Sequence, residues 1–292
     1  VINGQAANDN SGVSVASAGD VNGDGLADLI VGAYLSDPTT GTVDAGSTYV
    51  VFGKTNTSAI DLAAIASESG GGFVINGQGA SDKSGWSVAS VGDVNGDGLA
   101  DLIVGAPNAD TNPPANDNNN GKAYVIFGKS TTTSVNLASI QAGAGNGFSI
   151  TGRQAISVAG AGDVNGDGLA DMLVGGGSNS TSLVAKSAGE SFVIFGKTTT
   201  TDISLDTIAA GSTAGFVING QCISDRSGCS VASAGDVNGD GLADLIIGAL
   251  QADAPIAGGA STTDAGRSYV IFGASTAATI NLANIANGVG GF

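Results

Sequence analysis

The sequence of 292 residues has no histidine, two cysteines, one methionine and one tryptophan. Without histidine, every mechanism that needs an imidazole as base, nucleophile or metal ligand is excluded. Lys and Arg number only 9 against 26 Asp and Glu, which gives a formal charge of −17. So few cations cannot neutralise many phosphates, and we therefore expect no nucleic-acid partner.

Long apolar runs are also missing. No segment approaches the roughly 20 consecutive apolar residues that a membrane helix needs, so we expect no membrane insertion. The apolar residues nevertheless make up 42% of the chain, enough to build a sizeable core. Disorder of the whole chain is therefore not expected.

Internal repetition dominates the sequence. The string GDVNGDGLAD occurs four times, with its first aspartate at Asp20, Asp93, Asp163 and Asp236. Two further strings, Y/F-V-V/I-F-G and G-F-x-I-x-G, recur with a similar spacing. We interpret residues 1–292 as a single domain, or a segment of one, built from repeats at about 1–72, 73–147, 148–215 and 216–292.

Within each repeat the apolar runs are short and rich in β-branched residues. In the second repeat, Phe73 to Asn76, Trp86 to Ser90, Leu102 to Gly105 and Ala123 to Phe127 are predicted strands between Gly, Asn, Asp and Ser clusters. Val135 to Ile140 is predicted to be a short strand followed by a helical turn. No segment has a sustained helical period, so we predict an all-β fold. Four strands per repeat favour a β-propeller of four-stranded blades over a sandwich.

The segment from Asp20 to Asp28 carries the most chemical information. Oxygen-bearing side chains occupy its positions 1, 3, 5 and 9, position 7 can offer its main-chain carbonyl, and Gly25 permits a sharp turn. Ca²⁺ prefers six to eight such oxygens. The pattern predicts a calcium loop within a β-hairpin, and one Ca²⁺ per repeat, four in all. The expected ligands are Asp20, Asn22, Asp24, Leu26 and Asp28; Asp93, Asn95, Asp97, Leu99 and Asp101; Asp163, Asn165, Asp167, Leu169 and Asp171; and Asp236, Asn238, Asp240, Leu242 and Asp244.

A simpler interpretation is that these loops are only tight turns, because Asn-Gly and Asp-Gly are favoured turn dipeptides. A turn, however, needs no carboxylate at its ninth position. All four copies keep aspartate at positions 1, 5 and 9. Three carboxylates gathered so closely repel one another unless a cation lies between them. The metal interpretation is therefore favoured.

The stretch Ser84 to Ala106, followed by Pro107, resembles the FG-GAP repeat of integrin α-subunit propellers and their bacterial relatives. Similar repeats with V-I-F-G-K and G-F-x-I-x-G occur in large secreted bacterial, notably cyanobacterial, proteins. The resemblance implies four-stranded blades, Ca²⁺ between the first two strands of a blade, and extracellular adhesion rather than catalysis. The chain departs from the integrins in two respects. It has four repeats where integrin propellers have seven blades, and G-A-P is intact only once.

Two local features set single repeats apart. The third repeat lacks about three residues before Ser157, which could open a notch with Arg153 available for an anion; drift in a tolerant loop is the simpler interpretation. Cys222 and Cys229 occur only in the fourth repeat, and their spacing suggests one structural disulfide, with two free thiols as the alternative. Trp86 could be an exposed platform for a sugar, but packing between blades is the favoured role.

The long loops at 36–46, 108–121, 178–189 and 251–266 are the most variable parts of the chain. Asn116 to Asn120, Asp253 and Asp264 could supply further metal or sugar contacts, or could simply be solvated. We expect an unidentified protein or glycan ligand at these loops. A homo-oligomer formed through the terminal strand is a further interpretation.

The leading hypothesis is a secreted or cell-surface, calcium-stabilised propeller for adhesion, ligand binding or scaffolding, without enzymatic activity. One alternative is an array or sheath component that assembles through pairing of blades. Another is a carbohydrate-active or ester hydrolase. Against the hydrolase, almost every clustered aspartate is already assigned to a metal loop, and Glu68 and Glu190 lie in Gly/Ser-rich segments predicted to be turns.

Overall fold

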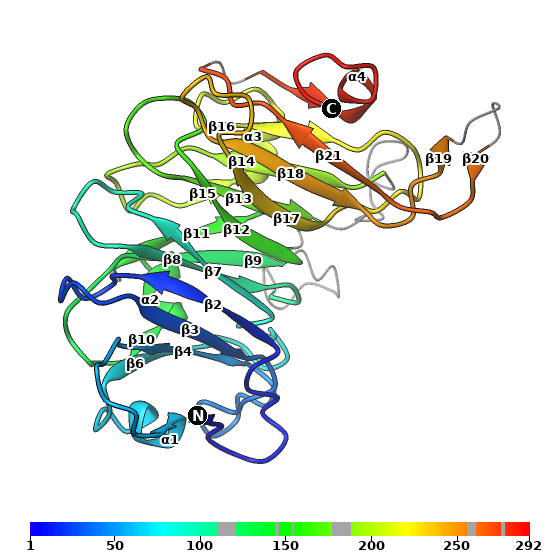
Figure 1. The fold of residues 1–292 in the computed structure, drawn as a ribbon. Coiled ribbons are helices and arrows are strands. Elements are labelled where there is room, and N and C mark those ends of the chain that lie inside the picture. The colour runs from blue at the N-terminus through cyan, green and yellow to red at the C-terminus, as the bar shows by residue number, and fades with distance from the viewer. Residues whose placement is uncertain (110–120, 144–145, 154, 177–187, 256–260, 276–277) are drawn as a thin grey trace. The chain divides into compact units, whose positions relative to one another are not determined.

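The structure is a computed structural model that describes residues 1–109, 121–143, 146–153, 155–176, 188–255, 261–275 and 278–292 (Figure 1). Nearly all of its regular elements are strands. The strands are β1 (Ile2–Asn3), β2 (Ser14–Gly19), β3 (Asp28–Ala33), β4 (Ser47–Val51), β5 (Ile60–Asp61), β6 (Gly72–Asn76), β7 (Ser87–Gly92), β8 (Asp101–Ala106), β9 (Lys122–Ile126), β10 (Val135–Asn136), β11 (Gly147–Thr151), β12 (Ser157–Gly162), β13 (Asp171–Gly176), β14 (Glu190–Ile194), β15 (Ile203–Ser204), β16 (Gly215–Asn219), β17 (Ser227–Gly235), β18 (Asp244–Ala249), β19 (Ala254–Pro255), β20 (Ser261–Thr262), β21 (Arg267–Ile271) and β22 (Ile280–Asn281). The described helices are one turn or slightly more: α1 (Leu62–Ala66), α2 (Leu137–Gln141), α3 (Leu205–Ala209) and α4 (Leu282–Ile285).

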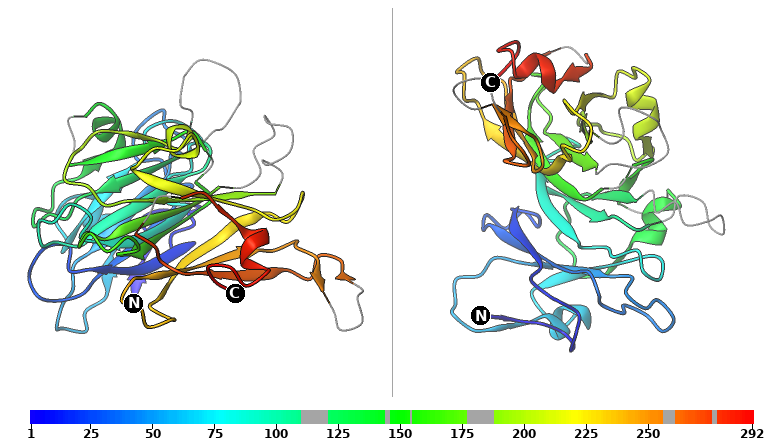
Figure 2. Two further views of the ribbon diagram at one scale, coloured as in Figure 1. Left: turned by 90° about the horizontal axis from the view of Figure 1, so that it is seen from above. Right: turned by 90° about the vertical axis from the view of Figure 1, so that its right-hand side faces the viewer.

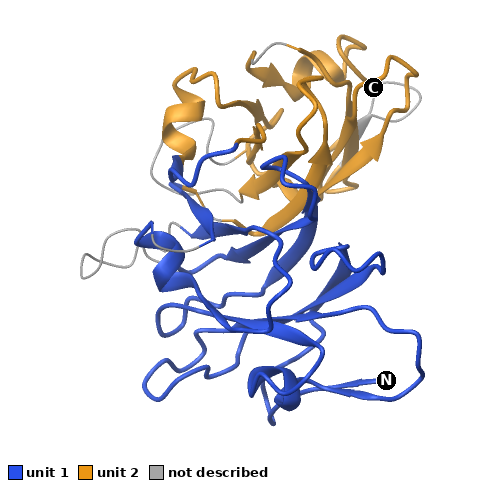
Figure 3. Cartoon of the chain, turned by 90° about the vertical axis from the view of Figure 1, so that its left-hand side faces the viewer, with its two compact units in different colours: residues 1–152, 198–203 blue, residues 153–197, 204–292 orange. Residues whose placement is uncertain are grey.

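The chain divides into two compact units (Figure 3). Unit 1 comprises residues 1–152 and 198–203, and unit 2 comprises residues 153–197 and 204–292. Figure 2 allows the strands of each unit to be followed from two further sides.

Each unit contains two main sheets, which we number in chain order. In unit 1 the first sheet has the strand order β10-β6-β4-β3-β2 and the second has β15-β11-β9-β8-β7. In unit 2 the third sheet has the order β12-β13-β14-β16-β22 and the fourth has β17-β18-β21. The last antiparallel strand of a sheet, such as β6, comes from the start of the next predicted repeat. The sheets are therefore offset from the predicted repeat boundaries by about one strand.

Antiparallel hairpins join the first two strands of each of the four main sheets. In the first sheet, Val15 pairs with Val31, and Val31 pairs in turn with Tyr49. A register shift lies between Ser17 and Gly19, just before the hairpin loop, and the same shift recurs in the other three sheets. The β-branched residues of these strands suit a pleated surface that is covered on both faces.

The predicted short strand and helical turn of each repeat are confirmed. Val135 and Asn136 form β10, which pairs in parallel with Ile75 and Asn76 of β6, and α2 follows directly. In α2, Leu137 and Ile140 lie three positions apart and therefore on one side of the helix, where both are buried. β10 is thus the edge strand of the first sheet, while α2 contacts β11 and β9 of the second.

Apolar side chains between paired sheets form the core of each unit. In unit 1, Ile30, Val50 and Phe73 of the first sheet are fully buried in one cluster with Leu102 and Val104 of the second. In unit 2, Leu173, Val193 and Phe216 of the third sheet share a cluster with residues of the fourth. The all-β prediction and the four predicted strands of the second repeat are confirmed, with small shifts at their ends.

Candidate functional site

The four predicted metal loops connect the first two strands of each sheet, as the sequence indicates. The loop of the first sheet lies between β2 and β3, and the others lie between β7 and β8, β12 and β13, and β17 and β18. Asp20 organises the first loop from its first position. Its Oδ1 accepts hydrogen bonds from the N–H groups of Gly23 (2.8 Å) and Asp24 (3.1 Å), and its Oδ2 accepts one from Gly25 (2.9 Å).

Asn22 and Asp24 lie beside Asp20 at the solvent-exposed end of the loop. Asn22 Oδ1 accepts the N–H of Asp24 at 2.8 Å, and its amide nitrogen donates to Asp24 Oδ2 at 3.0 Å. Asp24 Oδ1 accepts the N–H of Leu26 at 2.8 Å. Positive φ angles at Gly23 and Gly25, 77° and 86°, allow the chain to curl around these side chains.

Asp28, at the ninth position, lies behind this group and is fully buried. Its Oδ2 accepts the N–H of Val21 at 2.8 Å, and its Oδ1 accepts the N–H of Gly53, just after β4, at 2.7 Å. Asp28 therefore connects its own hairpin to the end of the third strand. The sequence predicts only a ligand role for this position; the structure adds a structural one, and the ligand role stays a prediction.

The other three loops repeat this geometry. The closing aspartates Asp101, Asp171 and Asp244 each accept two main-chain N–H groups in the same way, at 2.8–2.9 Å. The contacts of the first, third and fifth positions also recur in the second, third and fourth loops. All twenty residues predicted as ligands thus lie in four hairpin loops of one conformation.

Electrostatic repulsion accompanies this arrangement. Burial raises the pKa of Asp101 to about 7; the N–H groups of Gly128 and Val94 lower it, and the charges of Asp97 and Asp93 raise it. In the third loop burial similarly raises the pKa of Asp171 to about 6. The closing carboxylate therefore lies within electrostatic reach of the other two acids of its loop.

The donor set fits a hard cation in its chemistry. Each loop presents carboxylate, amide and carbonyl oxygens and no nitrogen or sulfur ligand, which is the set that Ca²⁺ prefers. Among the described residues, no group of three or more Asp, Glu or Cys side chains is placed so that it could hold a metal ion. An ion in the first loop would therefore rely on Asp20, Asp24, the Asn22 amide and the Leu26 carbonyl, with Asp28 behind them.

The opposite end of the strands holds a polar pair that the sequence analysis missed. The hydroxyl of Tyr124 donates to Gln78 Oε1 at 3.1 Å, and Tyr269 donates to Gln221 Oε1 at 2.8 Å. Tyr49 and Gln5 make the same contact in the first sheet. The available signal was the recurrence of Gln five residues after the Phe of G-F, together with the Tyr of Y-V-V/I-F-G.

A recurring aspartate in the loop before the first strand was also missed. Asp9 Oδ2 accepts the N–H of Ala6 (3.2 Å), Asp82 that of Gly79 (2.8 Å) and Asp225 that of Cys222 (3.1 Å). These carboxylates shape tight loops. The available signal was an aspartate two residues before the serine of S-G in the first, second and fourth repeats. The shortened third repeat lacks this aspartate.

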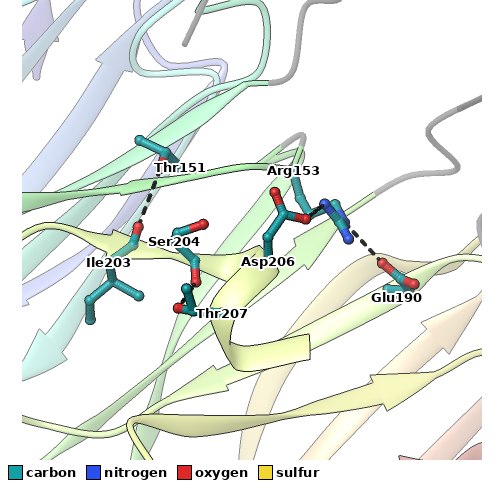
Figure 4. A network of polar contacts seen from close by, with 7 residues as sticks. All are labelled: Thr151, Arg153, Glu190, Ile203, Ser204, Asp206 and Thr207. Atoms are coloured by element: carbon teal, nitrogen blue, oxygen red, sulfur yellow. Dashed lines mark hydrogen bonds and ion pairs between the residues drawn. The ribbon is translucent and has the colours of Figure 1, made fainter. Parts of the chain in front are cut away.

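Arg153 is not available for an anion, contrary to the notch hypothesis. Its guanidinium is paired with Glu190 at 3.2 Å and with Asp206 (Figure 4). It also lies 6.0 Å from the centre of the Phe192 ring. Glu190 is the first residue of β14. The prediction that it lies in a turn is therefore wrong. In the third repeat, Arg153 thus occupies the place of Gln, and Phe192 that of Tyr.

The predicted disulfide is not formed. Both cysteines are free: Cys222 is exposed in its loop, and Cys229 lies in β17 with its thiol near the carbonyl of Gly248, at 3.6 Å. The side chain of Cys229 thus points towards the neighbouring strand β18, to which Gly248 belongs. The alternative of two free thiols is the one that the structure shows.

Trp86 is both packed against another aromatic ring and partly exposed, so it has features of the packing role and of the exposed platform. Its ring meets that of Tyr34, which follows β3, edge to face at 4.9 Å, and it stays 38% exposed. In the variable loops, Asp253 Oδ1 accepts the N–H of Asp264 at 3.1 Å, so these acids stabilise their own loop. Asn116 to Asn120 lie outside the described residues.

Comparisons with known proteins agree with this repeat architecture. The sequence profile of the FG-GAP repeat matches residues 11–51, 84–126 and 230–271. The chain thus belongs to the class of all-β repeat proteins, and its sheets are consistent with blades of a β-propeller. This chain contains FG-GAP repeats, and the third, irregular repeat falls outside the matched segments.

A relative in Caenorhabditis elegans supports the same relationship. A stretch of 103 residues is 38% identical to "Integrin alpha pat-2". The match covers 32% of this chain and only 7% of the integrin subunit. None of the helices that the structure describes is long and apolar enough to cross a membrane.

Proposed function

We propose that each hairpin loop binds one Ca²⁺, and that the four ions stabilise an extracellular adhesion or ligand-binding module. The observation that carries this proposal is the fourfold recurrence of one loop geometry with the same oxygen donors. In the first loop the ligands would be Asp20, Asn22, Asp24 and the carbonyl of Leu26, with Asp28 as a further ligand. The corresponding residues would serve in the other three loops.

Charge gives the ions a stabilising role. The chain has a formal charge of −17, and the loops hold 12 of its 26 acidic residues. Four divalent ions would bring the formal charge to −9 and would offset the repulsion within each loop. Because the raised pKa of Asp101 reflects both burial and neighbouring charge, a cation in the loop would favour its ionised form.

The FG-GAP repeats and the integrin relative support binding rather than catalysis as the function of the module. FG-GAP and integrin-like proteins are generally not enzymes. We further propose that the sheets are blades of a propeller, that the module acts outside the cell or at its surface, and that the loops remote from the hairpins bind a protein or glycan. Extracellular modules bind Ca²⁺ with dissociation constants of about 10⁻⁴ to 10⁻³ M, so an external calcium pool would saturate them.

Thermal unfolding with and without calcium tests the metal assignment. We expect exhaustive EDTA treatment to lower the Tm by on the order of 10 °C or more, because ions that bind only the folded state stabilise it. Calorimetric titration of the stripped protein should give four ions per chain. Magnesium at equal concentration should restore less of the Tm, since it fits flexible oxygen cages poorly.

A pair of matched variants separates ligands from other surface acids. Asp24→Asn, in a hairpin loop, should reduce the stoichiometry from four to three. Asp37→Asn changes an exposed aspartate in the loop between β3 and β4, where its carboxylate accepts the N–H of Asp44, and should leave four sites. An unchanged Tm after stripping, or an unchanged stoichiometry in Asp24→Asn, would reject the proposal.

A further inference from the structure

Every hairpin loop carries an Asn-Gly dipeptide at its third and fourth positions. The four dipeptides are Asn22-Gly23, Asn95-Gly96, Asn165-Gly166 and Asn238-Gly239. Asparagine is a thermolabile residue, because the main-chain nitrogen of the next residue can attack its side-chain amide carbon. Glycine makes this attack easiest, since it has no side chain to obstruct the approach and adopts conformations that other residues disfavour. Each of the four loops therefore contains a chemically reactive pair.

The attacking nitrogen of the first loop has a base beside it. The N–H of Gly23 donates to Oδ1 of Asp20 at 2.8 Å. This distance lies within the reach of about 2.6–3.2 Å that a general base requires. As the nitrogen attacks a carbonyl carbon, its proton becomes acidic, and a carboxylate in this position can accept it. The aspartate at the first position thus faces the atom that must lose a proton.

The amide group under attack is held in place by Asp24. Oδ1 of Asn22 accepts the main-chain N–H of Asp24 at 2.8 Å. When the amide carbon becomes tetrahedral, negative charge develops on this oxygen, and a fixed N–H group stabilises that charge. The amide nitrogen, which is the leaving group, donates to Oδ2 of Asp24 at 3.0 Å. One residue therefore orients both the carbonyl oxygen and the leaving nitrogen.

The other three loops repeat these contacts closely. In each of them the glycine nitrogen lies 2.7 Å from Oδ1 of the first aspartate. The asparagine Oδ1 accepts the N–H of the fifth residue at 2.7–2.8 Å, and the asparagine nitrogen donates to the carboxylate of that residue at 2.8–3.0 Å. The glycines of all four loops are exposed, so water can reach the reacting groups.

Asn-Gly pairs at two strand ends offer a comparison. At the end of β6, the N–H of Gly77 donates to the main-chain carbonyl of Gly46 at 2.9 Å, and the amide of Asn76 donates to Asn136. The pair Asn219-Gly220 at the end of β16 is held in the same way. A peptide carbonyl is a far weaker base than a carboxylate. These two asparagines are half-buried, as are those of the first three loops, so the acceptor of the glycine N–H is what distinguishes them.

We propose that the asparagine of each hairpin loop is a site of spontaneous deamidation, promoted by the aspartate at the first position. In the first loop, the nitrogen of Gly23 bonds to Cγ of Asn22 while its proton passes to Asp20. The side-chain nitrogen then takes up that proton and leaves as ammonia, which gives a cyclic imide. Water opens the imide at either of its carbonyl carbons and yields aspartate or isoaspartate. The reaction needs no metal ion and goes beyond the proposed calcium and ligand binding.

Either product changes the loop in which it forms. Aspartate adds one negative charge to a loop that already contains three carboxylates. Isoaspartate adds a methylene group to the main chain between the third and fourth positions. This displaces the N–H groups of Gly23 and Asp24, both of which donate to Oδ1 of Asp20. Asn22 is also a proposed calcium ligand, so a reacted loop would present a different third ligand.

Peptide mass spectrometry of the metal-stripped protein tests the proposal. During incubation in EDTA at neutral pH and well below the Tm, the four loop asparagines should deamidate about tenfold or more faster than Asn76 and Asn219. Incubation in water enriched in heavy oxygen labels the new carboxylates, which distinguishes them from deamidation during sample preparation. Equal rates in the loops and at the strand ends would overturn the proposal.

Asp20→Asn tests the role of the base. The amide oxygen of the variant can still accept the N–H of Gly23 but is a poor base, so deamidation at Asn22 should slow about tenfold or more. The other three loops keep their aspartates, and their rates should stay unchanged in the same molecule. Asp37→Asn, outside the hairpin loops, is the matched control and should leave all four rates as they are. An unchanged or faster reaction at Asn22 in Asp20→Asn would overturn the proposal.

Unfolding the wild-type chain gives a test that needs no variant. Denaturant removes the contacts of Asp20 and Asp24 with the dipeptide, so the rate at Asn22 should fall. It should approach the rate at Asn76, because the two dipeptides are then chemically alike. A rate at Asn22 that rises on unfolding would show that the folded loop protects its asparagine, and the proposal would be wrong.

Discussion

The two ends of the strands differ in how much variation they accept. At the hairpin end, all four sheets use the same aspartates with the same hydrogen bonds. At the opposite end, three sheets use a Gln–Tyr pair, and the third uses Arg153 with Glu190 and Phe192. We attribute the constancy of the hairpin to its buried carboxylate, which holds two main-chain N–H groups at once. At the other end, either a glutamine that accepts a tyrosine hydroxyl or an arginine paired with a glutamate fills the position beside the aromatic ring.

The largest effect is expected at the buried carboxylate of a hairpin. Asp28→Ala removes the acceptor for the N–H groups of Val21 and Gly53 and should lower the free energy of unfolding by about 3 kcal/mol even without calcium. Chemical denaturation in EDTA measures this. Asp24→Ala, at the exposed end of the same loop, is the control and should cost less than half as much. If both variants lost the same free energy of unfolding, burial of the carboxylate would not explain the stabilising role assigned to Asp28.

A smaller effect is expected at the substituted pair of the third repeat. Arg153→Gln removes the partner of Glu190 and should cost about 1–2 kcal/mol, because both side chains are only 13% exposed. The exposed Asp206 should contribute little. Adding Phe192→Tyr would introduce the hydroxyl that the other repeats possess.

The double variant Arg153→Gln with Phe192→Tyr should therefore recover part of the stability lost in Arg153→Gln. Urea denaturation of the single and double variants measures the recovery. A double variant no more stable than Arg153→Gln would mean that the two kinds of pair are not interchangeable.

The smallest effect is expected from one hydroxyl. Tyr49→Phe should cost about 1 kcal/mol at pH 7 through loss of its bond to Gln5. Burial raises the pKa of Tyr49 to about 12; the charge of Asp9 raises it further, and a hydrogen bond with Ser47 lowers it. A raised pKa means that the folded state holds the proton more tightly than the unfolded state.

The stability linked to that proton is therefore complete below pH 10 and is lost as the pH rises towards 12. Tyr49→Phe lacks this loss, so the difference in stability between wild type and variant should shrink across this range. Denaturation curves at pH 9 and pH 11 measure it. A constant difference would contradict the assignment of the raised pKa to Tyr49.

Much of the fold followed from local sequence patterns. Val135 to Ile140 was correctly predicted as a short strand and a helical turn, because the β-branched start and the L-x-x-I spacing are local signals. The hairpin position of Asp20 to Asp28 was equally accessible, since glycines and short polar side chains specify tight loops by themselves. The ligand role of these residues stays a prediction.

Other features depend on residues distant in the sequence. The disulfide prediction for Cys222 and Cys229 was wrong because close spacing does not determine side-chain direction, which β17 and its pairing with β18 set. The anion hypothesis for Arg153 failed for a similar reason: Glu190 and Asp206 lie 37 and 53 residues away.

The sequence by itself determined the repeats, the β-rich character and the position of the acidic loops, because each is carried by short local strings of residues that recur along the chain. Only the tertiary structure decided that Asp28 connects its hairpin to Gly53 and that Arg153 is paired with Glu190. These contacts join residues that lie 25 and 37 positions apart, and no local pattern specifies which distant segments will meet.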